Sequence, residues 1–413
     1  MELTMRFVSR DGCRAAAIAA LVCFASLLTA CQSVNYGLPY ASTAPQQPQA
    51  VTLPVKSGPA SGEILGTGQT RVALLLPLSA PGNGAAIAQE YRNAAQLALE
   101  ARGENTMELV IKDTGGSAAG ALARTEEAVR EGSAVVLGPV FSGSVTSAAS
   151  IARPNNLSII AFSSDPAAAS DGVFLMSFLP DQVVDRTISY ASGMGLTSFV
   201  AILPHGAYGA LVERQLRATL AAQGGVLTGV ARYQYNNESV LAAVQQVLQA
   251  IEQADAVFIP DGGSAPAAIA RIMQSEGITL SEKTLIGTGQ WRSSNLSSAF
   301  LQGALFADMD QSQFGAFKER YKERFAADPT VNGGLGYDAV NMTADLLATN
   351  NPAAFSAGAI ENPRGFDGVT GAFRFLPDGK TQRGLAVYRI EEGEAIVVDP
   401  APRFFGQTPI AQF

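Results

Sequence analysis

Residues 71–113 read "RVALLLPLSAPGNGAAIAQEYRNAAQLALEARGENTMELVIKD". Two apolar runs, VALLLP at 72–77 and MELVIKD at 107–113, flank a segment whose apolar residues recur every three or four positions. That spacing predicts an amphipathic helix, which Gly103 is suited to end. One face of the helix would carry Ile87, Tyr91, Ala94, Ala95 and Ala98. The stretch therefore predicts a strand, a helix and a second strand.

The same alternation continues along most of the chain. Apolar runs at 134–139 and 157–162 follow helical segments, and the pattern restarts at 199–204 and continues to 284–289. Strands that are apolar almost throughout and alternate with helices indicate a parallel sheet covered on both faces. We therefore expect an α/β fold with two Rossmann-like lobes of similar size.

The C-terminal part has a different pattern. Residues 314–329 and 336–348 are typical of helices, whereas 371–400 predicts strands with turns at 377–379 and 392–393. These segments would return to the two lobes after the regular alternation has ended.

The N-terminus is typical of an export signal. Arg6, Arg10 and Arg14 precede Ala15–Ala30, an uncharged and mostly apolar stretch. It is long enough for the core of a signal peptide but short of the roughly 20 residues that a membrane-spanning helix needs. We expect this segment to direct export.

The run LTAC at 28–31 resembles the bacterial lipobox, in which the cysteine is acylated and becomes the first residue. The alternative is an ordinary secretory signal with a chance cysteine. In the lipobox interpretation residues 1–30 are removed, Cys31 carries lipid, and the chain is held on a membrane surface. Gln32 follows in place of the Asp of an inner-membrane retention signal, so the anchor would lie in the outer membrane of a Gram-negative cell.

Residues 31–70 are rich in Pro, Gly, Ser, Thr and Gln, which predicts a flexible tether. Cys13 and Cys23 would leave with the signal, so the folded body would contain no thiol and need no disulfide. The whole chain has a formal charge of −8, and its first thirty residues contribute about +1 of that balance. This acidity opposes nucleic-acid binding, so we expect no nucleic-acid partner.

Ligands of open α/β sheets bind beyond the carboxyl ends of the strands. The segments at those positions are short and rich in Ser and Gly, and backbone N–H groups with Ser hydroxyls suit a carboxylate or another small anion. The alternative is that these residues only cap helices and form turns. The ligand candidates at these ends are Ser79, Ser142, Ser144, Ser163, Ser164, Tyr208, Asp261 and Ser264.

Catalytic interpretations are weak. The chain has one histidine, His205, and no HExxH, CxxC or GxSxG motif. His205 is better explained as an exposed loop residue. We therefore expect no enzyme, no catalytic residue, no metal site and no cofactor.

Several motifs then agree in order with one known family. The quoted stretch is followed by IKDTGG at 111–116, GPVFSGS at 138–144, AFSSDP at 161–166 and GYDAVNMTADLL at 336–347. The chain resembles type 1 periplasmic binding proteins of the Leu/Ile/Val-binding kind from Arg71 to about Val398. Within that superfamily LLLPLS, KDTGG and AFSSD look most like the lipoprotein activators of penicillin-binding proteins.

The resemblance implies two lobes joined by a hinge of three crossovers. The crossovers are expected near Ser177-Phe178, Gln290-Trp291 and Phe366-Gly368, which makes Phe178, Trp291 and Phe366 the hinge candidates. Packing between lobes is slightly favoured over ligand contact for Trp291. The expected domains are 1–30 as signal, 31–70 as lipidated tether, 71–178 with 291–366 as lobe 1, and 179–290 with 367–413 as lobe 2.

The resemblance also assigns roles to the candidates. Ser142 or Ser144, with Ser163 and Ser164, would hold the ligand's carboxylate, and Tyr208 would contact the ligand. The acidic partner of the ligand's ammonium group would have to be Asp261. The loop after it contains no Glu, which departs from the family pattern and weakens the amino-acid interpretation.

Two functions follow from the resemblance. The first is a non-enzymatic, periplasm-facing lipoprotein that binds a peptidoglycan synthase and regulates peptidoglycan synthesis. The second is the solute-binding receptor of a branched-chain amino acid ABC transporter, with a small amino acid and a permease as partners. An outer-membrane anchor favours the first, because such a receptor would have difficulty delivering cargo to an inner-membrane permease. The helical-repeat domain of better-known activators has no counterpart here.

Overall fold

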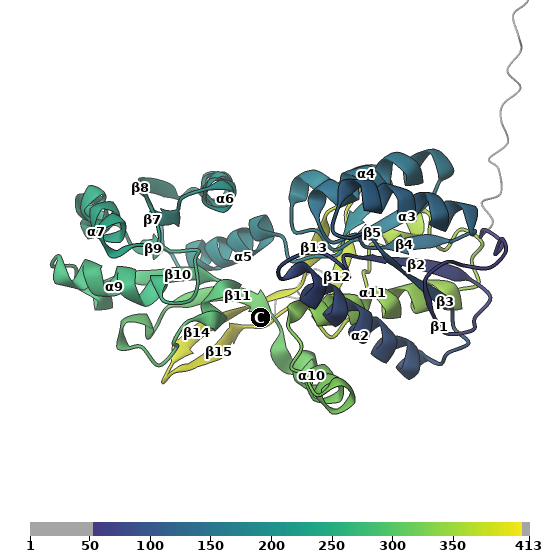
Figure 1. Cartoon of the computed structure of the whole chain (residues 1–413). Helices are drawn as coiled ribbons and strands as arrows, with labels where there is room; N and C mark the ends of the chain where they lie inside the picture. The colour runs from purple at the N-terminus through teal and green to yellow at the C-terminus, as the bar shows by residue number, and fades with distance from the viewer. Residues whose placement is uncertain (1–52, 407–413) are drawn as a thin grey trace, which may run out of the picture. The chain divides into compact units, whose positions relative to one another are not determined.

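The computed structural model describes residues 53–406, which carry two α/β lobes, each built on its own sheet (Figure 1). The first sheet has the strand order β1-β3-β2-β4-β5-β6. Its strands are Glu63–Leu65 (β1), Arg71–Leu76 (β2), Glu108–Asp113 (β3), Val135–Leu137 (β4), Ser158–Ala161 (β5) and Val173–Leu175 (β6). All of its pairings are parallel except that of β1 with β3.

Helices cover both faces of the first sheet, as the apolar strands predict. In β2, Val72, Leu74 and Leu76 face one core while Ala73 and Leu75 face the other. The alternation of side chains along a strand causes this division. The helices of this lobe are Gly84–Arg102 (α2), Ala118–Arg130 (α3), Ser142–Ala152 (α4), Gln311–Phe325 (α10), Val331–Ala348 (α11) and Ala357–Ile360 (α12).

The second sheet has the order β15-β14-β11-β10-β9-β7-β8. Its strands are Ser198–Pro204 (β7), Val226–Tyr233 (β8), Ala256–Phe258 (β9), Thr284–Thr288 (β10), Leu305–Met309 (β11), Leu385–Glu391 (β14) and Glu394–Asp399 (β15). The helices of this lobe are Pro180–Gly193 (α5), Ala207–Gln223 (α6), Asn237–Gln246 (α7), Leu248–Gln253 (α8) and Ala265–Ser275 (α9). The expected α/β fold of two sheets flanked by helices is confirmed, with antiparallel strands at the sheet margins.

The second crossover differs from the expected position at Gln290-Trp291. Strand β11 pairs in parallel with β10, Ile286 opposite Leu305, and antiparallel with β14. Residues up to Met309 therefore belong to the second lobe, and the chain passes to the first lobe between β11 and α10. Trp291 is fully buried in the core of the second lobe, where its indole Nε1 donates to the Ile259 carbonyl at 2.8 Å.

The third crossover also lies elsewhere than expected. Phe373–Phe375 (β12) and Thr381–Arg383 (β13) form a hairpin whose Phe373 and Phe375 lie in the core of the first lobe. Phe366 bridges to Phe373 and lies in the same lobe. The chain passes to the second lobe only between β13 and β14, because apolar residues of the hairpin complete the first core. The first crossover, between β6 and α5, contains Phe178 as expected.

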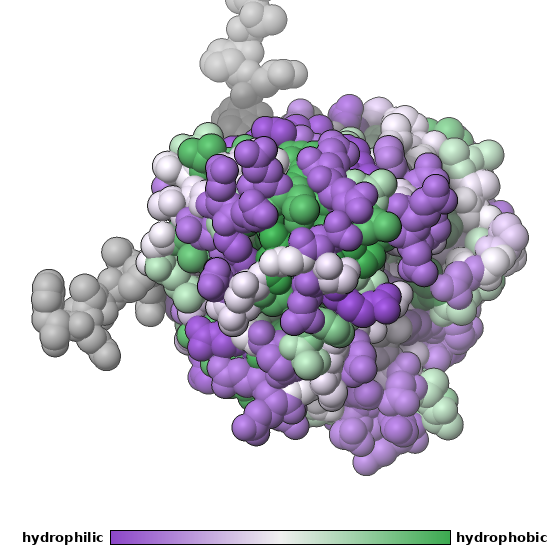
Figure 2. Space-filling view, turned by 90° about the vertical axis from the view of Figure 1, so that its left-hand side faces the viewer, coloured by the Kyte–Doolittle hydropathy of each residue, from purple (hydrophilic) through white to green (hydrophobic). Residues whose placement is uncertain are grey.

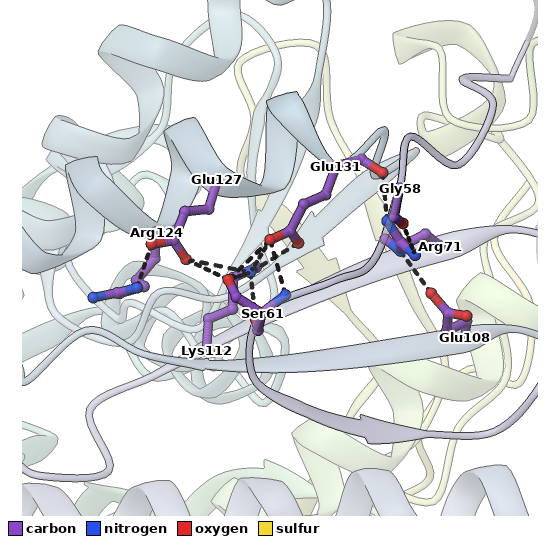
Figure 3. Close-up of polar contacts among 8 residues, drawn as sticks. All are labelled: Gly58, Ser61, Arg71, Glu108, Lys112, Arg124, Glu127 and Glu131. Atoms are coloured by element: carbon purple, nitrogen blue, oxygen red, sulfur yellow. Dashed lines mark hydrogen bonds and ion pairs between the residues drawn. The ribbon is translucent and has the colours of Figure 1, made fainter.

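The segment 53–70, expected to be part of a tether, belongs to the first lobe (Figure 3). Lys112 of β3 is buried, and its Nζ donates to the Ser61 carbonyl at 2.6 Å and lies 2.9 Å from Glu131. The Ser61 amide in turn donates to Glu131 at 3.0 Å. A buried lysine needs such partners, and they tie residues 55–65, hereafter the N-terminal strap, to α3 and β3.

Arg71 completes this attachment. Its guanidinium donates to Glu108 at 2.6 Å, to the Glu131 carbonyl at 2.7 Å and to the Gly58 carbonyl at 3.1 Å. The expected Cys31 lipidation and the signal peptide lie outside the described residues.

Figure 2 shows one end of the molecule, where hydrophilic residues surround a central strip of hydrophobic ones. Apolar side chains that reach solvent include Val226 on the edge strand β8. Within 53–406, no helix has the length and apolar character needed to cross a membrane.

Candidate functional site

An acidic side chain lies at the carboxyl end of β9. Asp261 is buried, with 8% of its surface exposed. One carboxylate oxygen accepts a hydrogen bond from the Tyr233 hydroxyl at 2.8 Å, and the other accepts from the Gly262 amide at 2.9 Å. Tyr233 ends β8, and the carboxyl ends of parallel strands meet at one sheet edge, so the fold brings the two side chains together.

Two further tyrosines lie beside this carboxylate. Tyr208, in the first turn of α6, is half-buried and donates to the Pro260 carbonyl at 3.2 Å. Tyr235 is 75% exposed, and its ring meets that of Tyr233 edge to face at 5.9 Å. We call Tyr208, Tyr233, Tyr235 and Asp261 the tyrosine–aspartate cluster.

The pKa values in this cluster reflect burial and a neighbouring negative charge. Burial and the hydrogen bond to Asp261 raise the pKa of the Tyr233 hydroxyl above its usual range. Burial, then Asp261, also raises the pKa of Tyr235. The phenols therefore stay protonated at neutral pH. A carboxylate among neutral aromatic rings is suited to an organic ammonium group.

Glycine is required where the loops of this edge approach each other. A Cβ at position 262 would come within 2.4 Å of the Gln290 carbonyl oxygen. Glycine at this position therefore lets the loop after β9 lie against the loop after β10. Thr288, at the end of β10, donates to the Pro260 carbonyl at 2.7 Å and fixes the same loop.

The carboxyl edge of the first sheet is built differently. The Ser79 amide donates to Asp113 at 3.1 Å, and the Gly115 amide donates to it at 2.8 Å. Burial raises the pKa of Asp113, but hydrogen bonds from Ser79 and nearby amides outweigh this and hold it below its ordinary value. The Ser79 side chain is exposed beside this ionised carboxylate.

Serine residues surround the N-terminus of α4 at the same edge. Ser142 is the first residue of the helix, and the preceding Phe141 provides no side-chain cap. Ser144 is 2% exposed, and its hydroxyl has no partner among the described residues. Ser163 is buried and accepts from the Asp165 amide at 3.2 Å, whereas Ser164 is exposed. Uncapped helix N–H groups carry a partial positive charge that favours an anion.

The remaining candidates have less defined roles. Ser264 is exposed and precedes α9 without a side-chain cap bond. His205 is exposed in the loop after β7. Sequence reasoning missed Tyr233 and Tyr235. The signal was present as the YQY run at 233–235, which begins at the last residue of β8.

A family model described as periplasmic binding protein matches residues 69–395, which is well over half of the chain. The chain belongs to the periplasmic binding protein family. This assignment agrees with the two-lobed fold and with polar residues at the carboxyl ends of both sheets.

Solved structures share the fold of this periplasmic binding protein. A putative branched-chain amino acid ABC transporter from Rhodospirillum rubrum aligns with a TM-score of 0.72 at 19% identity, covering 80% of this chain and 99% of that one. An ABC transporter substrate-binding protein from Sphaerobacter thermophilus aligns with a TM-score of 0.65 at 22% identity, covering 81% and 98%.

An uncharacterized protein of Rickettsia prowazekii is 23% identical over 340 residues, or 79% of this chain and 87% of that one. At these identities the solved structures establish the shared fold. They do not transfer a ligand to this chain.

Arg383, the last residue of β13, lies where the chain passes between the lobes of this periplasmic binding protein. Its Nε donates to the Ser177 carbonyl at 2.9 Å, and its guanidinium lies 4.2 Å from the centre of the Phe178 ring. Its backbone amide donates to Gln182 of α5 at 2.9 Å. Arg383 thus joins the first crossover to the third.

A buried acid supports this arginine. Nη1 of Arg383 donates to the Thr370 hydroxyl at 2.9 Å, and Asp338 of α11 accepts hydrogen bonds from the hydroxyl and amide of Thr370. Burial raises the pKa of Asp338 to about 6, although the Thr370 bonds act in the opposite direction. Burial lowers the pKa of Arg383 to about 10.

Proposed function

We propose that this chain is a non-enzymatic receptor for a small solute that carries an ammonium group, with amino acids as the first class to test. The observation that carries the proposal is the tyrosine–aspartate cluster. Asp261 is buried, its carboxyl group accepts hydrogen bonds from Tyr233 and the Gly262 amide, and it forms no ion pair with another described residue. An incoming ammonium group would supply the missing positive charge.

The first lobe offers hydrogen-bond donors for the carboxylate group of an amino acid. The uncapped N-terminus of α4, with the hydroxyls of Ser142, Ser163 and Ser164, offers donors to a carboxylate. Ser79 and Ser264 remain proposed contacts at the two edges. Ser144 is proposed as a contact only if α4 shifts, because its hydroxyl is sealed from solvent.

The family and its solved members support transport as the setting. The Rhodospirillum rubrum structure is described as a branched-chain amino acid ABC transporter, and a Burkholderia xenovorans structure as a branched-chain amino acid transporter's periplasmic ligand-binding protein. An ABC permease is accordingly the proposed partner, and branched-chain amino acids are the first ligands to try.

Calorimetric titration of residues 51–413 with L-leucine, L-isoleucine and L-valine tests the role of Asp261. Val51–Phe413 forms a compact unit and retains the strap that a body starting at 71 would lose. We expect binding that Asp261→Asn weakens about 10-fold or more, since it removes a charge-assisted hydrogen bond. Asp255→Asn is the matched control, because Asp255 lies at the opposite end of β9. Equal affinity of the D261N variant and the unmodified protein would contradict the proposed role.

A second proposed role is regulation of a peptidoglycan synthase from an outer-membrane lipid anchor. It is favoured by the LTAC run, by Gln32 and by the activator-like motifs LLLPLS, KDTGG and AFSSD. Cys31→Ser would release the protein from outer-membrane fractions if the anchor is correct. Retention of a penicillin-binding protein by the immobilised 51–413 unit, together with no binding of amino acids, would favour this role over the receptor.

A further inference from the structure

The chain crosses between the lobes a fourth time after its last strand. Ala401, two residues beyond β15, packs against the core of the second lobe. Pro402 then runs beside the third crossover, where a Cβ on Gly384 would lie 2.6 Å from the Pro402 carbonyl oxygen. Three residues later, Phe405 contacts the first lobe. Residues 401–406, hereafter the C-terminal strap, therefore touch both lobes.

The Phe405 side chain packs at a defined position on the first lobe. The guanidinium of Arg374 on β12 lies 5.0 Å from the centre of the Phe405 ring. Arg374 is fixed by hydrogen bonds to Gln382 at 2.7 Å and to the Pro363 carbonyl at 3.0 Å. Gly365 leaves room for the Phe405 ring, since a Cβ at this position would lie 2.8 Å from the ring. A cation held in place beneath an aromatic ring makes an attractive contact.

The strap is fixed at its ends and less closely packed between them. A cavity of about 140 Å³ is lined by Asp310, Gln313, Asp367, Gly371, Pro402 and Arg403. These residues come from the second crossover and the first turn of α10, from the segment before β12 and from the strap itself. A segment held at both ends beside open space restrains the distance between its attachment points without filling the hinge.

We propose that the C-terminal strap restrains the relative movement of the two lobes. It adds a fourth link to the three crossovers and lies beyond residue 395, where the match to the family ends. Removing the Phe405 contact would leave the strap attached to the second lobe alone. The range of distances between the lobes would then increase. This inference is independent of which solute binds.

Double electron–electron resonance spectroscopy, which measures the distances between two spin labels, tests whether the strap restrains the lobes. Residues 51–413 contain no cysteine, so Ser150→Cys on α4 and Gln274→Cys on α9 would be the only labelling sites. Phe405→Ala should broaden the distribution of distances between the labels. Phe404→Ala is the matched control, because that neighbouring ring is 55% exposed.

A second pair of variants removes the strap itself. A chain that ends at Pro400 should broaden the distribution as F405A does, whereas one that ends at Gly406 should match the unmodified protein. Circular dichroism identifies any variant that fails to fold. If the truncated chain does not fold, the distance distribution of F405A alone tests the proposal. Unchanged distributions in folded F405A, or equal broadening in F404A, would overturn the proposal.

Discussion

Asp255 is the clearest case at the residue scale of a carboxylate that stabilises the fold. It accepts hydrogen bonds from the amides of Thr197 and Ser198 and from both of their hydroxyls. These bonds, led by the Thr197 amide, lower its pKa to about 2. The stability it contributes is present above its ordinary pKa of 3.8 and is lost as the pH falls toward 2.

Asp255→Asn should therefore lower the free energy of unfolding by about 1 kcal/mol at pH 7, a modest value because the group is near solvent. The difference between variant and unmodified protein should shrink between pH 4 and pH 2. Urea unfolding at several pH values measures it. A difference that stays constant down to pH 2 would contradict the assigned cause.

Asp338 has the opposite pH dependence. Its pKa is raised to about 6 from 3.8, so the ionised form is less stable in the folded protein than in the unfolded chain. Its contribution to stability should grow as the pH falls from about 6 to about 4. In Asp338→Asn this component of the pH profile should vanish. The variant should also be less stable by about 1–3 kcal/mol at pH 5, because the amides of Val369 and Thr370, which now bond to separate carboxylate oxygens, would share one amide oxygen. Parallel pH profiles of the two proteins would argue against this.

At the scale of elements, the N-terminal strap is held to the first lobe mainly through Lys112. Lys112→Met removes the cation shared by Glu127, Glu131 and the Ser61 carbonyl. Breaking a buried ion pair by removing one partner costs about 3–5 kcal/mol, and a similar loss of unfolding free energy is expected. Trypsin should also cut faster after Lys56, which the strap holds 2.7 Å from Glu108.

Lys318→Met is the matched control for this change. Lys318 makes an exposed ion pair with Asp328 at 3.5 Å, and such pairs contribute about 0–1 kcal/mol. If K112M and K318M lost the same stability, the strap would not depend on Lys112.

Strand β10 allows a separate test of the second lobe. A Cβ at Gly287 would lie 2.2 Å from the indole of Trp291, the single tryptophan of the chain. Gly287→Ala should force the indole to move and lower the unfolding free energy by about 1–3 kcal/mol. Tryptophan fluorescence should shift to longer wavelength as well, because Trp291 is fully buried. An unchanged emission maximum would show that the core of this lobe is looser than described.

For the whole molecule, periodicity predicted the strands and helices but not which lobe each late strand joins. An apolar run such as Leu305–Met309 shows that a strand exists, and only its pairing with β10 and β14 decides its sheet. The tether was expected to reach residue 70 because its composition is polar. The contrary signal was Lys112 inside an apolar strand, since a buried lysine requires partners from somewhere in the chain.

The candidate site was predicted in part. Asp261 and Tyr208 were proposed because they follow strands, whereas Tyr233 and Tyr235 were missed because Tyr208 and Trp291 were the aromatic residues weighed as ligand contacts. Trp291 was assigned to the hinge, although its indole packs against Gly287 in the preceding strand and donates to the carbonyl of Ile259, which follows a different strand. Contacts between side chains on different strands are set by the fold, so local patterns could not reveal them.

The most direct test of the proposed receptor function is thermal unfolding of residues 51–413 against a panel of amino acids and cell-wall fragments. A ligand at about 100 times its dissociation constant adds roughly 2.7 kcal/mol to the free energy of unfolding. We predict a clear rise in Tm with at least one amino acid and, in the Asp261→Asn variant at the same ligand concentration, a rise that is smaller by about half or more. No rise with any compound that carries an ammonium group would contradict the proposal.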